Sequence, residues 1–292
     1  MDWSILFQVL VNGLLIAGLY AVVSVGLTLV LGVMGIVNFA HGEMVMLGAY
    51  LAFWLFVRFG IDPFLATIPA GTVLFALGAI LYLVLLRPVL KAPPLNQLLL
   101  TLGLSIFLQN AALLLWGADF RTVATGYSDM SLALGPVRMG LNRLLTFLVS
   151  LALTVGLLLM LYRTRVGRAM RAVSQNQVGS LLIGINADRT YLLAFGAATA
   201  MAGASGALVS TVMYTMPTVG LRLALKAFAI VIIGGLGNVT GALMGSAVLG
   251  LAESVVGTFV PQGPGWAEGI SFILIMLVLI LRPAGFAGVR RE

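Results

Sequence analysis

The amino-acid sequence predicts an all-α polytopic membrane protein, and its composition and long apolar stretches carry that prediction. Hydrophobic residues make up 61% of the chain, whereas charged residues make up only 9%. The mean hydropathy is +1.13. Because about a quarter of the residues in a soluble domain are charged, this composition excludes a soluble globular protein.

The apolar stretches indicate helices rather than the strands of a transmembrane β-barrel. Barrel strands alternate polar and apolar residues over short segments, but residues 144–161 are predominantly apolar on all sides. We expect about eight or nine hydrophobic segments, which lie near 5–34, 42–58, 64–87, 95–117, 143–163, 190–213, 221–236, 240–259 and 268–282.

Three of these segments are short for a membrane span. A helix rises ~1.5 Å per residue, so about twenty residues are needed to cross a hydrocarbon core of roughly 30 Å. The segments 42–58, 221–236 and 268–282 are shorter than that. They are either broken or re-entrant helices buried inside the protein, or helices whose ends extend past the apolar residues.

The distribution of arginine and lysine predicts the orientation in the membrane, because cytoplasmic loops carry an excess of both. With the polar segment 163–189 in the cytoplasm, ten basic residues lie inside and five outside, and Lys226 lies within a segment. The inner residues are Arg87, Lys91, Arg163, Arg165, Arg168, Arg171, Arg189, Arg282, Arg290 and Arg291. The predicted topology has the N-terminus outside and the C-terminus inside, with 118–142 as a short external loop.

The polar segment 163–189 has two interpretations. Basic residues that follow a span signal orientation and need have no other role. However, about twenty-five residues separate the neighbouring spans, which is far more than a connecting turn requires. Residues 167–184 mix apolar and polar side chains in a way that favours one or two short helices at the membrane surface. A partner protein could dock on such helices, so the segment either signals orientation alone or also forms a docking surface; the family resemblance described below favours docking.

Several chemistries are missing from the sequence. There is no cysteine and one histidine, which excludes thiol chemistry and multi-histidine metal sites. Lys91 and Lys226 are each followed by alanine, so no Walker A motif exists, and no Gly-x-Ser-x-Gly or His-Glu-x-x-His motif occurs. The basic residues lie mainly at span ends. We therefore expect no catalytic residues, no cofactor or metal on this chain and no nucleic-acid partner.

Three ionisable residues, Glu43, Lys226 and Glu253, fall within predicted segments. Each costs roughly 2.5–3.5 kcal/mol on insertion scales unless it is paired or hydrated. They either line a path for a polar substrate or form an internal charge pair that holds helices together. In the second case Lys226 pairs with Glu43 or with Glu253, and the sequence leaves both partners open.

The segment Asn38-Phe39-Ala40-His41-Gly42-Glu43 predicts a break between two helices. Helix ends and freed backbone groups can bind a polar or zwitterionic ligand. Alternatively, Asn38 and His41 cap the break themselves. We favour capping for Asn38 and leave both roles open for His41.

Small residues predict close contact between helices. They dominate 197–207, and Gly241 and Gly245 form a Gly-x-x-x-Gly motif. Such residues allow helix backbones to approach one another in a membrane, so we assign both sets to packing. A second glycine-rich break at 234–241 resembles the one near 38–43 and suggests an internal repeat of the kind found in transporters.

Several motifs together resemble the branched-chain amino-acid ABC permease family, and within it the smaller, LivH-like subunit. The motifs lie at 26–44, 167–172, 181–186, 216–217, 226–228, 234–238, 241–245 and 251–253. The resemblance covers essentially the whole chain, so it implies a single transmembrane permease domain over 1–292 in a bacterial inner membrane.

The resemblance also implies partners and a coupling loop at about 163–189. The partners are a second permease (a paralogue or another copy), two cytoplasmic ABC ATPases that bind the ATP, and a periplasmic substrate-binding protein. Within the loop, the residues that match the family pattern are Arg168, Arg171, Ala172, Gly184 and Asn186. The segment departs from the Glu-Ala-Ala pattern of many importers, because Arg171-Ala172-Val173 stands in that place.

We therefore expect a permease subunit of a binding-protein-dependent importer of branched-chain amino acids, with Asn38, His41, Glu43, Lys226 and Glu253 as candidate path residues. A related permease for urea or short amides is an alternative. A second alternative is an ion-coupled secondary transporter that works alone, with Glu43 or Glu253 carrying the proton. A purely structural membrane scaffold is less compatible with the helix breaks.

Overall fold

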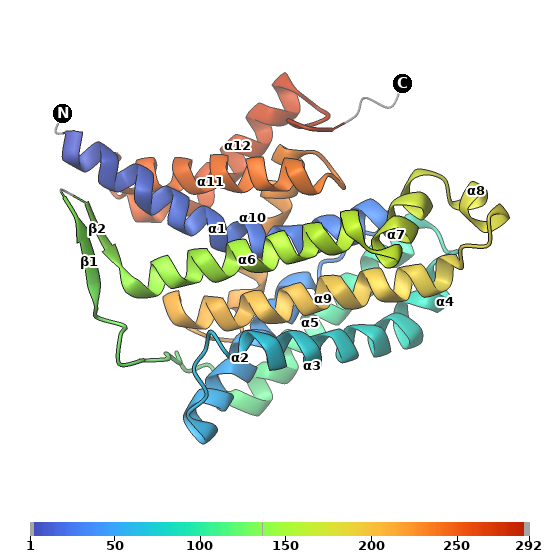
Figure 1. Cartoon of the computed structure of the whole chain (residues 1–292), viewed down its shortest axis with the longest axis horizontal. Coiled ribbons are helices and arrows are strands. Elements are labelled where there is room, and N and C mark those ends of the chain that lie inside the picture. The colour runs from blue at the N-terminus through green and yellow to red at the C-terminus, as the bar shows by residue number, and fades with distance from the viewer. Residues whose placement is uncertain (1–2, 136, 289–292) are drawn as a thin grey trace.

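The computed structural model describes residues 3–135 and 137–288, and it forms one bundle of long helices that lie side by side (Figure 1). Arg290 and Arg291, which the charge distribution assigned to the inner side, lie outside the described residues. Among the described residues, seven helices are long and apolar enough to cross a membrane. The prediction of an all-α polytopic membrane protein is confirmed.

Each predicted hydrophobic segment corresponds to a helix. The helices are α1 (Trp3–Met34), α2 (His41–Phe59), α3 (Thr67–Leu81), α5 (Pro94–Trp116), α6 (Leu141–Arg163), α9 (Ala187–Val212), α10 (Val219–Gly234), α11 (Val239–Phe259) and α12 (Ala267–Leu281). Helix α3 continues through a π-helical turn, η1 (Tyr82–Leu86), into α4 (Arg87–Val89), and a short 3₁₀ turn, η2 (Gly263–Trp266), precedes α12.

The two ends of the bundle differ in character. The polar segment 163–189 forms α7 (Arg165–Gln175) and α8 (Gln177–Leu182) at the end of the bundle where α12 finishes (Figure 1). The start of α1 and a two-stranded hairpin lie at the opposite end (Figure 1). We call these the α7–α8 end and the hairpin end. The two short helices match the prediction for 167–184, and the membrane side of each end stays a prediction.

The hairpin is an element that the sequence analysis did not predict, since 118–142 was expected to form a simple loop. Strands β1 (Ser131–Leu134) and β2 (Val137–Gly140) pair antiparallel. The Gln8 side chain holds β2 against α1, because its amide donates to the Arg138 carbonyl and its oxygen accepts from the Arg138 amide, both at 2.8 Å. The strands are only four residues long, so their alternation is too brief to stand out in the sequence.

The rest of that connection is fixed by a tyrosine. Tyr127 donates a hydrogen bond to Asp62, which follows α2. Burial and this hydrogen bond raise the pKa of Tyr127 to about 12. Earlier in the same connection, the backbones of Arg121 and Thr215 exchange hydrogen bonds of 3.0 and 2.8 Å. The connection between α5 and α6 is therefore tied to the loops that follow both α2 and α9.

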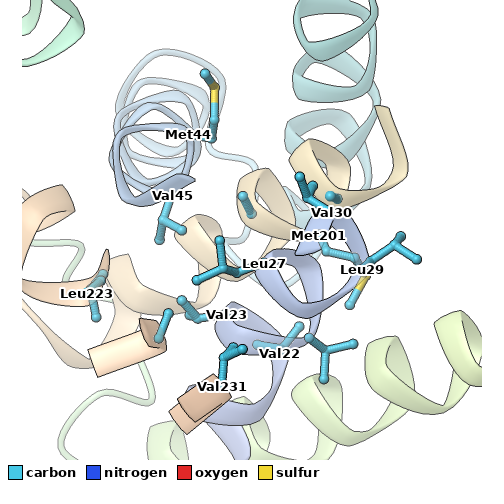
Figure 2. Close-up of a cluster of buried hydrophobic side chains, with 14 of the residues drawn as sticks. Val22, Val23, Leu27, Leu29, Val30, Met44, Val45, Met201, Leu223 and Val231 are labelled. Carbon is cyan, nitrogen blue, oxygen red and sulfur yellow. The ribbon is translucent and has the colours of Figure 1, made fainter. Parts of the chain in front are cut away.

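The core is built around α1, most of which is buried along its inner two thirds. Figure 2 shows aliphatic side chains of four helices meeting there, namely Val22, Val23, Leu27, Leu29 and Val30 of α1, Met44 and Val45 of α2, Met201 of α9, and Leu223 and Val231 of α10. Lipid offers no hydrophobic drive for helix association, so close van der Waals packing must supply the stability.

Glycines make that packing possible, as the small-residue stretches predicted. A Cβ on Gly48 of α2 would clash with the backbone of Gly203 on α9. In the same way, Gly241 of α11 packs directly on the backbone of Gly234 at the end of α10. The predicted Gly-x-x-x-Gly motif thus joins α10 to α11, and 197–207 joins α9 to α2.

We predict that Gly48→Val destabilises the protein. Overpacking a tight interface costs about 1–3 kcal/mol, and here the obstacle is backbone that cannot rotate away. The matched control is Gly103→Val on the exposed face of α5, where an added Cβ meets nothing within 4 Å. Thermal unfolding in detergent measures both. Equal melting temperatures for the two variants would contradict the role of the α2–α9 contact.

Candidate functional site

The break between α1 and α2 places the start of α2 inside the bundle. His41, the first residue of α2, donates through Nε2 to the Val23 carbonyl of α1 at 2.8 Å. Val23 lies eleven positions before the end of α1, so the chain turns back along α1 before α2 begins. The Asn38 side chain accepts a hydrogen bond from the Ala40 amide at 3.1 Å. Asn38 therefore stabilises the turn that precedes α2, while the first turn of α2 itself has no side-chain cap.

Glu43 lies in the first turn of α2 at the middle of the bundle. It is buried, and Ser105 donates to its Oε1 at 3.2 Å. Ser105 is close to the midpoint of the 23-residue helix α5. The other oxygen, Oε2, packs against Gly220 in the first turn of α10 and has no hydrogen-bond partner among the described residues.

Two helix N-termini therefore meet at one carboxylate. A helix N-terminus carries a partial positive charge of roughly half an elementary charge. Both α2 and α10 begin beside Glu43, so its carboxyl group lies next to two such ends. The close approach requires glycine, because a Cβ on Gly42 would clash with the Gly220 carbonyl. The two helix ends would offset a negative charge at this position.

Lys226 and Glu253 form a separate buried network with Tyr20. The Lys226 ammonium pairs with Glu253 Oε1 and donates to the Tyr20 hydroxyl at 2.9 Å. The Tyr20 hydroxyl donates in turn to Glu253 Oε2 at 2.6 Å. Ser271 of α12 reaches Glu253 Oε1 at 3.4 Å. Of the two pairings that the sequence left open, the structure forms the one with Glu253, and it ties α1, α10, α11 and α12 together.

The five candidate path residues thus form two groups rather than one. Asn38, His41 and Glu43 surround the start of α2, whereas Lys226 and Glu253 lie with Tyr20. Helix α10 links the groups, since Gly220 and Lys226 are six residues, or about 9 Å, apart along it. Among the described residues, no three acidic or histidine side chains gather in a way that could hold a metal ion.

The polar segment at the α7–α8 end is shaped by three caps and one tight turn. The side chains of Thr164, Asn176 and Asn186 accept hydrogen bonds from the first turns of α7, α8 and α9. Such caps each stabilise a helix by about 1 kcal/mol. Gly167 allows α7 to fold back on the end of α6, because a Cβ there would clash with the Leu161 backbone. These caps and the tight turn give the segment a defined conformation.

The candidate coupling residues occupy different environments in this segment. Arg168 and Gly184 are exposed, and Gly184 has a positive φ of 81° that suits glycine. Arg171 is half-buried, with its guanidinium 4.9 Å from the centre of the Tyr162 ring. Ala172 is half-buried on α7, and Asn186 caps α9.

The segment also exposes a group of large apolar side chains that the sequence analysis did not single out. Leu182 is 84% exposed, Ile183 74% and Val178 70%. These residues lie on or just after α8, at the tip of the α7–α8 end (Figure 1). A group of large exposed apolar side chains is typical of a surface that a partner protein covers.

Comparisons with known proteins decide the family. The family model described as "Branched-chain amino acid transport system / permease component" matches residues 9–279. The branched-chain amino acid permease proteins LivH of Escherichia coli and BraD of Pseudomonas aeruginosa are each 33% identical, over 96% of this chain and 95% of their own length. The chain belongs to this permease family.

A second type of subunit is also similar to the permease. The LivM permease protein of Salmonella typhimurium is 25% identical over 94% of this chain and 68% of its own length. No solved structure matches the permease with statistical significance. The resemblance that the sequence motifs indicated is confirmed.

The sequence analysis did not identify three residues that contact the buried charged side chains of the permease: Tyr20 beside Lys226 and Glu253, and Ser105 and Gly220 beside Glu43. Tyr20 lies in the long apolar run of α1, far from either end, whereas tyrosine in spans is enriched at the interfaces. The position of Tyr20 deep within a span was therefore the one sequence feature that could have marked it as part of a buried polar network. Ser105 and Gly220 carry no such signal, because serine and glycine are common where membrane helices pack.

We predict that Lys226→Met strongly destabilises the permease and that adding Glu253→Gln restores most of the loss. Removing one partner of a buried pair leaves an uncompensated charge, which costs about 3–5 kcal/mol. The exposed pair of Arg87 and Asp188, 3.1 Å apart, is the control, and Arg87→Met should cost less than about 1 kcal/mol. The measurement is unfolding in detergent. Additive losses in the double variant would rule out the pairing as a source of stability.

Proposed function

We propose that this chain is the membrane subunit of a binding-protein-dependent ABC importer for branched-chain amino acids in a bacterial inner membrane. The observation that carries the proposal is the family match over nearly the entire chain, joined to relatives whose names state that transport system. The bundle with two interior helix starts supports it, because discontinuous helices are typical of transport proteins.

The energy for transport enters from another chain. The sequence has no Walker A motif, and the similar proteins are named as transport permeases, so we assign this subunit a transport role with ATP hydrolysis on another chain. The α7–α8 end supplies the contact with a cytoplasmic ATPase, since it combines the exposed apolar residues of α8 with Arg168 of α7. This assignment places the hairpin end outside, where a binding protein delivers the substrate.

The permease works in a pair. Its similarity to both LivH and LivM types supports assembly with a related permease subunit, and a second copy of the same chain is the alternative arrangement. Two ATPases and one binding protein complete the complex. The path for substrate runs between the hairpin end and the α7–α8 end.

Reconstitution into liposomes tests the function. The permease is purified with candidate partner permease, ATPases and binding protein, and uptake of labelled leucine is followed with ATP inside the vesicles. We expect uptake that requires ATP and the binding protein, with urea as a poor competitor. Uptake by the permease alone, driven by a proton gradient, would instead establish a secondary transporter.

The contact with the ATPase predicts an uncoupled variant. Arg168→Glu with Arg171→Glu reverses two charges on α7, and like charges across an interface cost several kcal/mol, which corresponds to about tenfold or more in uptake. Because Arg171 also packs on Tyr162, Arg168→Glu alone is measured beside the double variant.

The control for this variant is Lys91→Glu, an exposed charge change in the connection between α4 and α5 at the same end. Basal ATP hydrolysis should persist in all variants, while stimulation by the loaded binding protein should be lost in the α7 variants and kept in the control. Normal stimulation in the double variant would remove α7 from the docking surface.

A further inference from the structure

A cavity of about 470 Å³ lies in the half of the bundle nearer the hairpin end. Its walls come from the first half of α1, the first turns of α6, the end of α9 and the second half of α11, and they include Asn12, Arg143, Val212 and Thr258. Sites for small molecules occupy about 300–1,000 Å³. The cavity is therefore large enough for an amino acid.

An acidic and a basic side chain line this one cavity, and the acidic one is the partner of Lys226, which itself does not line the cavity. The Glu253 carboxylate contributes from α11, with only 7% of its side chain exposed. The Arg143 guanidinium contributes from α6, is exposed, and has no ion-pair partner among the described residues. A carboxylate can accept about four hydrogen bonds, and Glu253 receives three, from Tyr20, Lys226 and Ser271. It can accept one more.

The remaining walls are partly aliphatic and partly polar. Leu15, Ile16 and Leu19 line the α1 side, and Val212 lines the α9 side. The hydroxyls of Thr146 and Ser254 add polar groups. A cavity that joins an acidic group, a basic group and an aliphatic wall matches a ligand with the same three parts.

We propose that this cavity binds a zwitterionic α-amino acid with an aliphatic side chain on its way through the permease. The ammonium group faces Glu253, the carboxylate faces Arg143, and the side chain packs on Leu15, Leu19 and Val212. The inference rests on the proposed function and adds to it a site on this subunit. Lys226 already balances the charge of Glu253, so the ligand ammonium adds a hydrogen bond at the acceptor position that Glu253 leaves open. A simple amine would lack the contact with Arg143, and a simple carboxylate would leave that acceptor position of Glu253 unfilled.

A larger groove on the same bundle lacks the charged groups that a zwitterion needs. It measures about 860 Å³ and runs between α3, α6 and α9, where Phe75, Leu153 and Met201 are among its lining residues. None of its described lining residues is charged. Such a groove offers nothing to either charge of an amino acid, so the smaller cavity is the site for the zwitterion.

The test is photolabelling of the permease–ATPase complex in lipid nanodiscs, without the binding protein, by the diazirine analogue of leucine. We expect labelled peptides from 12–19 of α1 and from 254–258 of α11. Excess leucine should abolish this labelling, whereas isoamylamine, which lacks the carboxylate, and isocaproate, which lacks the ammonium, should not. Labelling confined to other helices, or equal competition by either analogue, would overturn the proposal.

Two arginine variants sharpen the test. Arg143→Gln should weaken competition by leucine about tenfold or more, because a hydrogen bond to a charged group is lost. Arg138→Gln is the matched control, since Arg138 is also exposed at the hairpin end but does not line the cavity. Equal effects of the two substitutions would show that general positive charge, rather than this site, attracts leucine.

Import and competition measurements together distinguish a failure of the proposed binding site from a failure of the proposed function. If the wild-type complex imports leucine with ATP and the Arg143 variant competes normally, the proposed function holds and the cavity is not the site. If the wild-type complex imports no leucine under any condition, the proposed function itself fails. Retained import with weakened competition in Arg143→Gln supports both.

Discussion

The pairing of Lys226 with Glu253 is the interaction on which the arrangement of the bundle depends. Two charges shielded from water persist only when each has a partner and further hydrogen bonds. Tyr20 and Ser271 provide those bonds, so helices α1, α10, α11 and α12 share one network. The same Glu253 carboxylate lines the cavity near the hairpin end. In our proposal this one residue therefore both holds helices together and binds the substrate.

Glu43 follows the same physical rule in a different form. Its carboxyl group lies beside the N-termini of α2 and α10, and their partial positive charges would offset a negative charge there. The two helices can begin this close together because Gly42 and Gly220 have no side chains between them. Charge compensation and small residues thus act together, and both helix starts are held at the middle of the bundle rather than at a surface.

Much of this fold could be predicted from the sequence, because lipid imposes simple rules on length and polarity. The helical segments, the surface helices within 163–189 and the Gly-x-x-x-Gly contact all follow from local pattern. The choice of Glu253 over Glu43 as the partner of Lys226 does not, since it depends on how α10 and α11 rotate against each other. Tyr20 lies 206 residues from Lys226, and no local pattern joins residues so far apart. The hairpin was missed because its strands are too short to show alternation.

The most direct test of the account is a cryo-electron microscopy structure of the complete transporter with leucine in its outward-facing state. The account predicts density for leucine between α1, α6 and α11, with its ammonium toward Glu253 and its carboxylate toward Arg143. It also predicts that α7 and α8 are seated in the ATPase. Leucine bound elsewhere while this cavity stands empty, or an ATPase that makes no contact with α7 and α8, would contradict it.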